Sequence, residues 1–141
     1  IWRIEELPII PETWILRPKD DAKKQLAVIG KLIKEAGEIV NAGDPDREGQ
    51  LLVDEVLEHF KSSKPTRRFW VSAQDSVSVK RGLAALKDNT TYKGWADAAR
   101  GRQRADWLIG MNLSRAYTLR AQRGGSRALL VELHLKLTHL G

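Results

Sequence analysis

The stretch from residue 38 to residue 60 constrains the fold most. Its pattern predicts a strand, an acidic loop and a helix that follow one another directly. The segment 38–43 is short and largely apolar and ends in glycine, a pattern that is typical of a buried strand. The sequence Asp-Pro-Asp-Arg-Glu-Gly follows at 44–49, and apolar residues then recur at helical spacing as far as Phe60. A buried strand that leads directly into an amphipathic helix predicts an α/β unit.

The segments on either side continue this alternation. Residues 1–19 are punctuated by prolines and are expected to be irregular, whereas apolar spacing predicts a helix over 20–37 and a second strand over 68–72. Helix, strand, helix and strand in this order predict parallel strands joined by right-handed crossovers. Ligands bind at the carboxyl ends of such strands, which is where Asp44 and Asp46 fall.

The character of the sequence changes near residue 75. Two helices are predicted over 76–87 and 95–120, and the second has an apolar face. The members of that face are Ala98, Ala105, Ile109, Leu113 and Ala116. We therefore predict an α/β domain over 1–74 and the start of a helical domain over 75–118.

The chain is basic, with 24 Lys and Arg against 18 Asp and Glu, a net charge of +6 and a pI near 9.8. This charge favours a polyanionic partner, because each phosphate neutralised by Lys or Arg releases counterions. Cysteine is absent, which excludes disulfides and thiolate metal sites and fits a reducing cytoplasm. No apolar run approaches the roughly 18 residues that a membrane-spanning helix needs. We expect a cytoplasmic, monomeric protein without a membrane segment.

Three acidic residues, Asp44, Asp46 and Glu48, alternate after the predicted strand. If the extended backbone continues, their side chains project to the same side. Pro45 supports this geometry by restricting Asp44 to extended conformations. Three carboxylates there would suit Mg²⁺, which combines one or two carboxylates with water and substrate phosphate. The ion would screen and orient a phosphate under attack.

Two other interpretations of the acidic segment stay open. Asp46 can be the N-cap of the following helix, with Glu48 as a first-turn acid that complements the helix dipole. Counted from Asp44, the run as far as Glu55 also matches most of an EF-hand calcium loop. An EF-hand requires a helix before the loop, whereas residues 38–43 resemble a strand.

The helix predicted over 95–120 combines cations with a flat aromatic side chain. Arg100, Arg104 and Arg115 fall on nearly one face, and Trp107 lies beside them. Single-stranded DNA binding requires cations for the backbone and flat faces for the bases, so this face suits a DNA track. The open alternatives are that Trp107 belongs to the core and that the arginines form an ordinary solvated face.

Four stretches in order resemble type IA DNA topoisomerases of the topoisomerase III kind. Residues 41–50 resemble the Asp-x-Asp-x-Glu motif of the Toprim fold in the form A-x-D-P-D-R-E-G that this family carries. Residues 7–11 resemble the segment before the motif, residues 68–73 the closing Toprim strand, and residues 105–118 the next domain. Toprim alone would also admit primases and some nucleases, so the order of all four stretches is what makes the likeness specific.

The resemblance implies a Toprim-like fold, which is a Rossmann-like parallel sheet, followed by the start of a helical DNA-binding domain. It implies an ATP-independent reaction in which a tyrosine attacks a single-strand phosphodiester, a second strand passes and the break is resealed. Asp44 and Asp46 would bind Mg²⁺, and Glu48 would complete the acidic set as a metal and catalytic residue. Arg47 would be a catalytic residue near the scissile phosphate; a solvated first-turn arginine is the alternative.

The resemblance also implies DNA contacts for Trp2, Trp107 and Arg115, to which the helical face adds Arg104. Single-stranded DNA is therefore the expected partner. The rival interpretation is a non-catalytic remnant that binds single-stranded DNA. The two interpretations differ over whether the three acidic side chains converge.

Two parts of the family's machinery are expected to lie outside this sequence. The glutamate of the first Toprim strand would precede Ile1, and the nucleophilic tyrosine would follow Gly141. Tyr92 and Tyr117 do not sit in the family's tyrosine context. We therefore expect a fragment that carries the acidic half of the active site and does not cleave DNA by itself.

The tail at 119–141 departs from the family pattern. The family would continue toward Ser-Val-Gly-Arg-Val-Gln-Thr-Pro, whereas here an arginine-rich stretch leads into alternating leucines. This change after Thr118 suggests a frameshift or a degraded gene, which sequencing of the locus would test.

Overall fold

The computed structural model describes residues 2–125, which fall into two compact units. One unit contains the N-terminal segment as far as Trp14 together with the chain from Gly101 onward, and the other is Ile15–Arg100. The longest helix, α4 (Lys93–Arg123), begins in the second of these units and continues into the first. The tail predicted to diverge is helical as far as Arg123, and residues 126–141 lie outside the described part.

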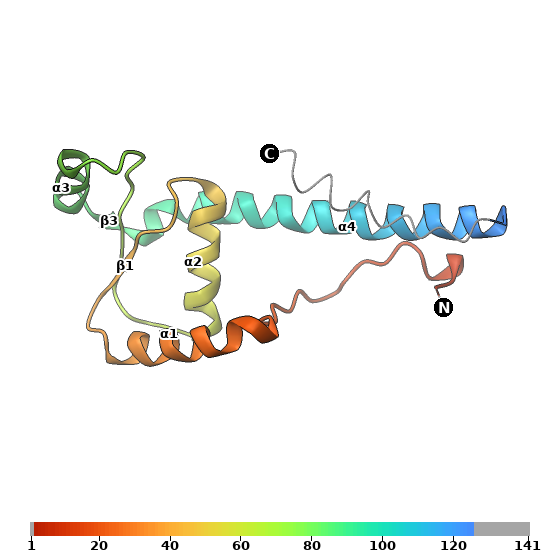
Figure 1. Ribbon diagram of the computed structural model, residues 1–141, viewed down its shortest axis with the longest axis horizontal. Helices are drawn as coiled ribbons and strands as arrows, with labels where there is room; N and C mark the ends of the chain where they lie inside the picture. Colours follow the sequence, from red (N-terminus) through yellow and green to blue (C-terminus); the bar gives the residue numbers. More distant parts are fainter. Residues whose placement is uncertain (1, 126–141) are drawn as a thin grey trace. The chain divides into compact units, whose positions relative to one another are not determined.

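The unit Ile15–Arg100 alternates helices with short strands, as Figure 1 shows. In chain order its elements before α4 are η2 (Asp20–Ala22), α1 (Lys23–Glu35), β1 (Ile39–Asn41), α2 (Arg47–His59), β2 (Thr66–Arg68), α3 (Ser76–Ala84), β3 (Lys87–Asp88) and η3 (Asn89–Tyr92). The predicted α/β class, followed by a long helix, is confirmed.

The three strands form one sheet in the order β1-β2-β3. The predicted parallel pairing is confirmed, since β1 and β2 run parallel with Ile39 opposite Thr66. The prediction of a strand over 68–72 is wrong in position, because β2 ends at Arg68. The prediction of a helix over 76–87 is wrong at its end, because residues 87–88 instead pair antiparallel with β2. Apolar spacing gave no sign of this two-residue strand, which exists only through its long-range hydrogen bonds.

Close packing joins the helices of this unit. A Cβ atom on Gly30 of α1 would lie only 2.5 Å from the Phe60 ring at the end of α2, so only glycine permits this approach. Leu51 of α2 and the residues Ala96 and Ala99 of α4 form a small buried cluster. These contacts fix α2, the helix that follows the acidic loop, between its neighbours.

The other unit consists of an N-terminal strap, residues 2–14, and the part of α4 from Gly101 onward. The strap is irregular apart from η1 (Ile4–Glu6), as expected for this proline-rich stretch. The predicted apolar face of the helix is largely exposed in the described residues, since Ile109 is 53% and Leu113 40% exposed. The strap instead contacts a polar and aromatic stripe of α4, which apolar periodicity does not detect. Among the described residues, no helix is both long and apolar enough to cross a membrane.

Candidate active site and DNA interface

The acidic loop leaves the carboxyl end of β1 and enters α2 directly. Asp46 is the N-cap of α2, and its Oδ1 accepts a hydrogen bond from the backbone N–H of Gly49 at 2.6 Å. Glu48 lies in the first turn of α2, where an acid complements the helix dipole. The helix-cap interpretation of Asp46 is thus confirmed. The EF-hand interpretation is wrong, because the strand β1 and not a helix precedes the loop.

The premise that placed three carboxylates on one side is also wrong. That prediction required an extended backbone from Asp44 to Glu48, whereas the helix begins at Arg47. Successive residues in a helix turn about 100° from one another, so Glu48 does not continue the alternation. Within residues 2–125, no group of three His, Cys, Asp or Glu side chains is arranged to hold a metal ion. Asp44 and Asp46 are both exposed and follow the carboxyl end of β1.

Arg68, at the end of β2, ties the acidic loop to the sheet. Its side chain is 1% exposed. Nη1 is directed at the carbonyl oxygens of Asn41 (3.1 Å), Gly43 (2.7 Å) and Phe69 (2.9 Å). Nη2 donates to the carbonyl oxygen of Asp44 at 2.6 Å. The guanidinium therefore fixes the backbone of the loop rather than pairing with its carboxylates.

Burial lowers the pKa of Arg68, since it removes water from the guanidinium. The nearby carboxylates of Asp54, Asp46 and Asp44 act in the opposite direction and favour the charged form. The acidic character of the loop thus stabilises the cation that holds the loop in place. Sequence reasoning missed this role because Arg68 reads as one of several arginines in a basic stretch.

Two glycines allow the loop to fold back on the first turn of α2. A Cβ atom on Gly43 would lie 2.6 Å from the carbonyl oxygen of Gly49. A Cβ atom on Gly49 would collide with the backbone oxygen and nitrogen of Asp44. Any larger residue at 49 must therefore displace the backbone that carries Asp44.

A network of amide side chains lies behind the loop. The carboxylate of Asp54 accepts hydrogen bonds from Gln50 (3.0 Å) and from Asn89 (2.8 Å). Asn89 Oδ1 in turn accepts from Asn41 Nδ2 at 3.0 Å and from Gln50 Nε2 at 2.9 Å. Gln50 and Asn41 are fully buried, so these bonds satisfy side-chain amide nitrogens that are costly to leave unpaired. The network joins β1, α2 and η3 around the base of the acidic loop, and none of its members was predicted from the sequence.

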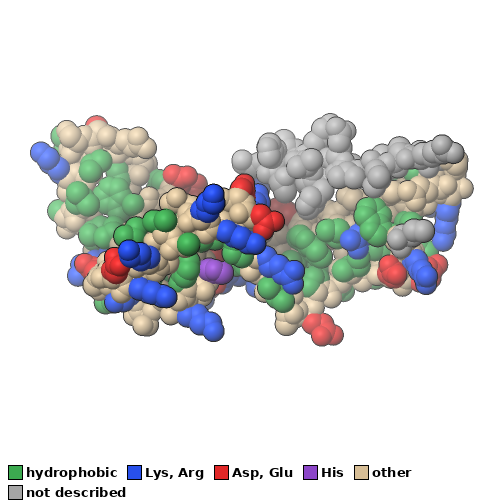
Figure 2. Space-filling view, turned by 60° about the horizontal axis from the view of Figure 1, so that its bottom comes forward, with side chains coloured by type: hydrophobic (Ala, Val, Ile, Leu, Met, Phe, Trp, Pro, Cys, Tyr) green, Lys and Arg blue, Asp and Glu red, His purple; other side chains and the backbone are tan. Residues whose placement is uncertain are grey.

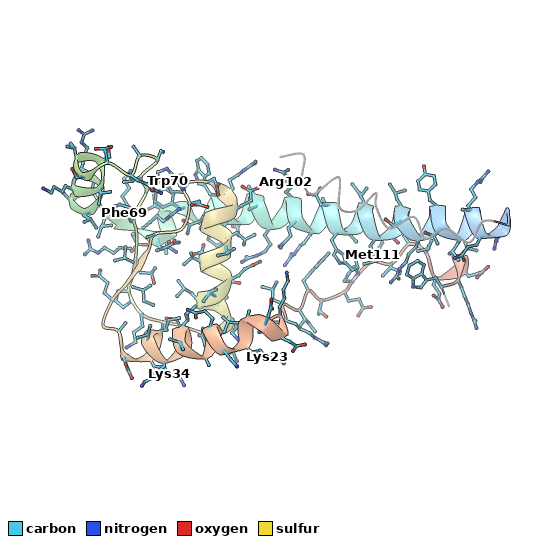
Figure 3. All side chains as sticks on the ribbon, in the orientation of Figure 1. Lys23, Lys34, Phe69, Trp70, Arg102 and Met111 are labelled. Carbon is cyan, nitrogen blue, oxygen red and sulfur yellow. The ribbon has the colours of Figure 1, made fainter. Side chains whose placement is uncertain are left out.

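Aromatic side chains cover the exit of β2. Trp70, labelled in Figure 3, stacks on Tyr92 with ring centroids 4.7 Å apart, and Arg68 lies over the Trp70 ring at 4.7 Å. Trp95 meets Trp70 edge to face at 5.2 Å. Tyr92 is therefore part of this aromatic cluster.

The strap and α4 bring a second set of residues together. The guanidinium of Arg115 lies 5.0 Å from the centre of the Trp2 ring. Trp14 meets Trp107 edge to face at 5.3 Å, and Arg104 lies over Trp14 at 5.3 Å. We name these five residues the basic–aromatic surface. Four of them were predicted from the sequence, and Trp14 was missed because it lies in a proline-rich segment without helical spacing.

The rest of the predicted arginine face is used differently. Arg100 forms ion pairs with Glu58 at 2.8 Å and with Asp97 at 3.7 Å, so it belongs to the unit Ile15–Arg100. Trp107 is half-buried, and its core interpretation is only partly right. In Figure 2, Lys and Arg side chains are scattered among hydrophobic ones on the visible face, without one continuous basic block.

Comparisons with known proteins cover the acidic loop and the elements around it. The Toprim domain model matches residues 7–73, which include β1, the acidic loop, α2 and β2. DNA topoisomerase 3 of Vibrio cholerae is 49% identical over 92% of this chain, and that of Haemophilus influenzae is 47% identical over the same share. The protein of the same name from Salmonella typhimurium is 41% identical.

The chain is a topoisomerase III-like fragment. It spans about a fifth of the length of the topoisomerase III relatives that it matches. Because 92% of the chain is aligned, the alignment with topoisomerase III extends past Thr118. The division into domains at 1–74, 75–118 and 119–141 stays a prediction. Toprim domains of topoisomerases are generally metal-binding.

Proposed function

We propose that this chain is the metal-binding part of an ATP-independent type IA DNA topoisomerase, which breaks one DNA strand, passes another and reseals the break. One observation carries the proposal: the acidic loop lies at the carboxyl end of β1 in a chain whose relatives are named DNA topoisomerase 3. Ligands of parallel α/β sheets bind at this end of the strands. A cytoplasmic location and a monomeric state belong to the same proposal.

Asp44 and Asp46 are the residues that would hold Mg²⁺, with Glu48 as a third acid. The donor set fits the ion in part, since Mg²⁺ needs only one or two carboxylates besides water and phosphate oxygens. Asp46 uses one carboxylate oxygen for the cap of α2 and keeps the other. When bound, the ion would screen the negative charge of a DNA phosphate and orient it. Arg68 would hold the loop backbone in place around it.

Arg47 and Glu48 are the proposed catalytic residues. Both lie in the first turn of α2, directly after the loop, and both are exposed. Arg47 would contact the scissile phosphate, and Glu48 would act in the acidic set. The family's reaction also needs a tyrosine nucleophile, and we assign that role to neither Tyr92 nor Tyr117. The chain alone is therefore proposed to bind without cleaving DNA.

The basic–aromatic surface is the proposed contact with single-stranded DNA. Arg104 and Arg115 supply cations for phosphates, and the rings of Trp2, Trp14 and Trp107 supply faces for bases. Trp2 and Trp14 are 39% and 36% exposed, so each ring keeps accessible area besides its protein contacts.

A second candidate function is a non-catalytic remnant that binds single-stranded DNA without a metal ion. The engagement of Asp46 as a helix cap, together with the helical start at Arg47, favours this alternative. The two candidates predict the same DNA binding and differ over the acidic loop.

Asp46→Asn separates the two candidates. Asparagine caps helices as well as aspartate does, so the variant should keep α2 and change the unfolding free energy by less than about 0.5 kcal/mol. Removal of one of two carboxylate charges should weaken Mg²⁺ binding by about tenfold. The measurement is a Mg²⁺ titration followed by the amide NMR signals of residues 44–49. Asp21→Asn, a change of the same kind at an exposed site, is the control; if both variants bind Mg²⁺ like the unaltered chain, the remnant is favoured.

Trp2→Ala tests the DNA surface. Base–aromatic stacking contributes about 1–3 kcal/mol per base, so the variant should bind a fluorescein-labelled oligothymidylate about tenfold more weakly. Trp95→Ala is the matched control, because Trp95 is 47% exposed and lies outside the basic–aromatic surface. Equal affinity of the two variants would contradict the proposed surface. Measurement at several salt concentrations separates stacking from phosphate contacts, since only the latter change the salt slope.

A further inference from the structure

The side-chain amide of Asn112 forms hydrogen bonds with the backbone of the strap. Asn112 Oδ1 accepts a hydrogen bond from the backbone N–H of Ile9 at 2.6 Å, and Nδ2 donates to the carbonyl oxygen of Ile9 at 3.0 Å. Nδ2 also donates to the carbonyl oxygen of Leu108 at 2.8 Å, one turn earlier in α4. Both amide hydrogens and the oxygen are thus engaged, which fixes the orientation of the amide. Asn112 pairs with Ile9 much as a neighbouring β-strand residue would.

Asn112 lies between the two tryptophan positions of the basic–aromatic surface. Arg115, which faces Trp2, comes three residues after it, and Trp107, which faces Trp14, comes five residues before it. The strap therefore runs antiparallel to this part of α4, as the red and blue segments of Figure 1 show.

The lengths of the two segments explain why a fixed point is needed. The eight residues of helix from Trp107 to Arg115 rise about 12 Å. The twelve residues of strap from Trp2 to Trp14 could extend to about 40 Å. A segment with this much excess length has many registers along the helix. Contacts of exposed rings with arginines are individually weak, so they do not select one register by themselves.

We propose that Asn112 is a positioning residue for single-stranded DNA binding, because it fixes the register in which Trp2 and Trp14 both reach their partners on α4. The inference rests on the proposed DNA surface and adds a residue that does not itself touch DNA. Without the hydrogen bonds between Asn112 and Ile9, the strap remains attached at residue 14, but Trp2 is no longer held over Arg115. Single-stranded DNA would then have to order the strap as it binds, which weakens affinity.

Asn112→Ala tests this role in the full 141-residue chain. Alanine is the best helix former, so α4 should persist in far-UV circular dichroism. Hydrogen exchange at the Ile9 amide should become faster, while the amides of Ala96 and Ala99 keep their protection. Affinity for oligothymidylate should fall about tenfold, as when one stacked base is lost, with an unchanged salt slope. Gln103→Ala, an amide removed from an exposed site of the same helix, should change neither quantity.

A double-mutant cycle with Trp2→Ala distinguishes positioning from a merely structural role. If Asn112 acts through Trp2, Trp2→Ala should cost about tenfold in the unaltered chain and less than about twofold in the Asn112→Ala background. An equal cost in both backgrounds would overturn the positioning role. If Trp2→Ala weakens binding and Asn112→Ala does not, only the inference about Asn112 is wrong. If Trp2→Ala has no effect even in the unaltered chain, the proposed DNA surface is wrong, and the proposed role of Asn112 is then wrong as well.

Discussion

Replacement of Arg68 by alanine is expected to destabilise the unit Ile15–Arg100 by about 4 kcal/mol, the largest effect of any single substitution in the acidic site. The guanidinium is buried and is directed at the carbonyl oxygens of residues 41, 43, 44 and 69. Without it the carbonyl oxygens of Gly43 and Phe69 lose this donor, whereas those of Asn41 and Asp44 keep the backbone N–H groups of Phe69 and Asp46. Each buried group left unpaired costs about 1–3 kcal/mol. Urea unfolding followed by far-UV circular dichroism measures the loss.

Arg67 provides a matched control one position earlier in β2. Its side chain is 54% exposed and pairs with Glu38 at 2.7 Å. An exposed ion pair contributes at most about 1 kcal/mol, so Arg67→Ala should change stability little. Similar losses for the two variants would mean that Arg68 does not hold the loop as described.

Arg68→Lys distinguishes the geometry of the guanidinium from its charge. Lysine keeps the positive charge but presents a single ammonium group, which cannot span the carbonyl oxygens of Gly43 and Asp44 as Nη1 and Nη2 do. The variant should therefore recover only part of the lost stability. Complete recovery would show that charge alone is needed beside the acidic loop.

The second large effect is expected for Gly49→Ala. The added methyl group would collide with the backbone of Asp44, so the loop must move or α2 must begin later. Overpacking of this kind lowers the free energy of unfolding by about 1–3 kcal/mol. We expect a value at the upper end, because the added methyl group meets backbone atoms, which cannot move aside as a flexible side chain can. The displaced Asp44 should also weaken Mg²⁺ binding, as seen in the amide signals of residues 44–49.

Gly101→Ala is the control for the same chemical change. Gly101 lies inside α4, and nothing lies within 4 Å of a Cβ atom built on it. Alanine there should stabilise the helix by about 0.5–1 kcal/mol, because glycine is the poorer helix former. Opposite signs for the two substitutions would establish that the approach of Asp44 to residue 49, and not glycine content in general, requires glycine. A stabilising Gly49→Ala would contradict the close approach.

The path from strand to loop to helix could be predicted because its signals are local. The apolar run before Gly43 predicts β1, and the alternation of acids with proline predicts the break that follows. Asp46 caps the helix only three residues from its hydrogen-bond partner Gly49, so the sequence itself contains both partners of that interaction. The same locality explains the error at Glu48, since strand-like alternation and a helix start look alike over five residues.

The parts that could not be predicted depend on residues far apart in the chain. β3 exists only because residues 87–88 meet the edge of β2, and two residues carry no periodic signal. The face of α4 that the strap contacts was not predicted, because the contacts are made by Asn112, arginines and tryptophans. Apolar periodicity in the sequence indicates where apolar side chains lie on a helix, but it does not indicate such polar contacts.

By itself the sequence determined the likeness to topoisomerase III, the α/β class and the place of the acidic loop, because motif order, turn chemistry and helix capping act over a few neighbouring residues. Only the tertiary structure decided that Arg68 is the buried cation that holds this loop, and that Asn112 holds the strap. Arg68 reaches Asp44 across 24 positions, and Asn112 reaches Ile9 across 103. A hydrogen bond of that span depends on how the intervening chain folds, and so the residue type alone does not reveal it.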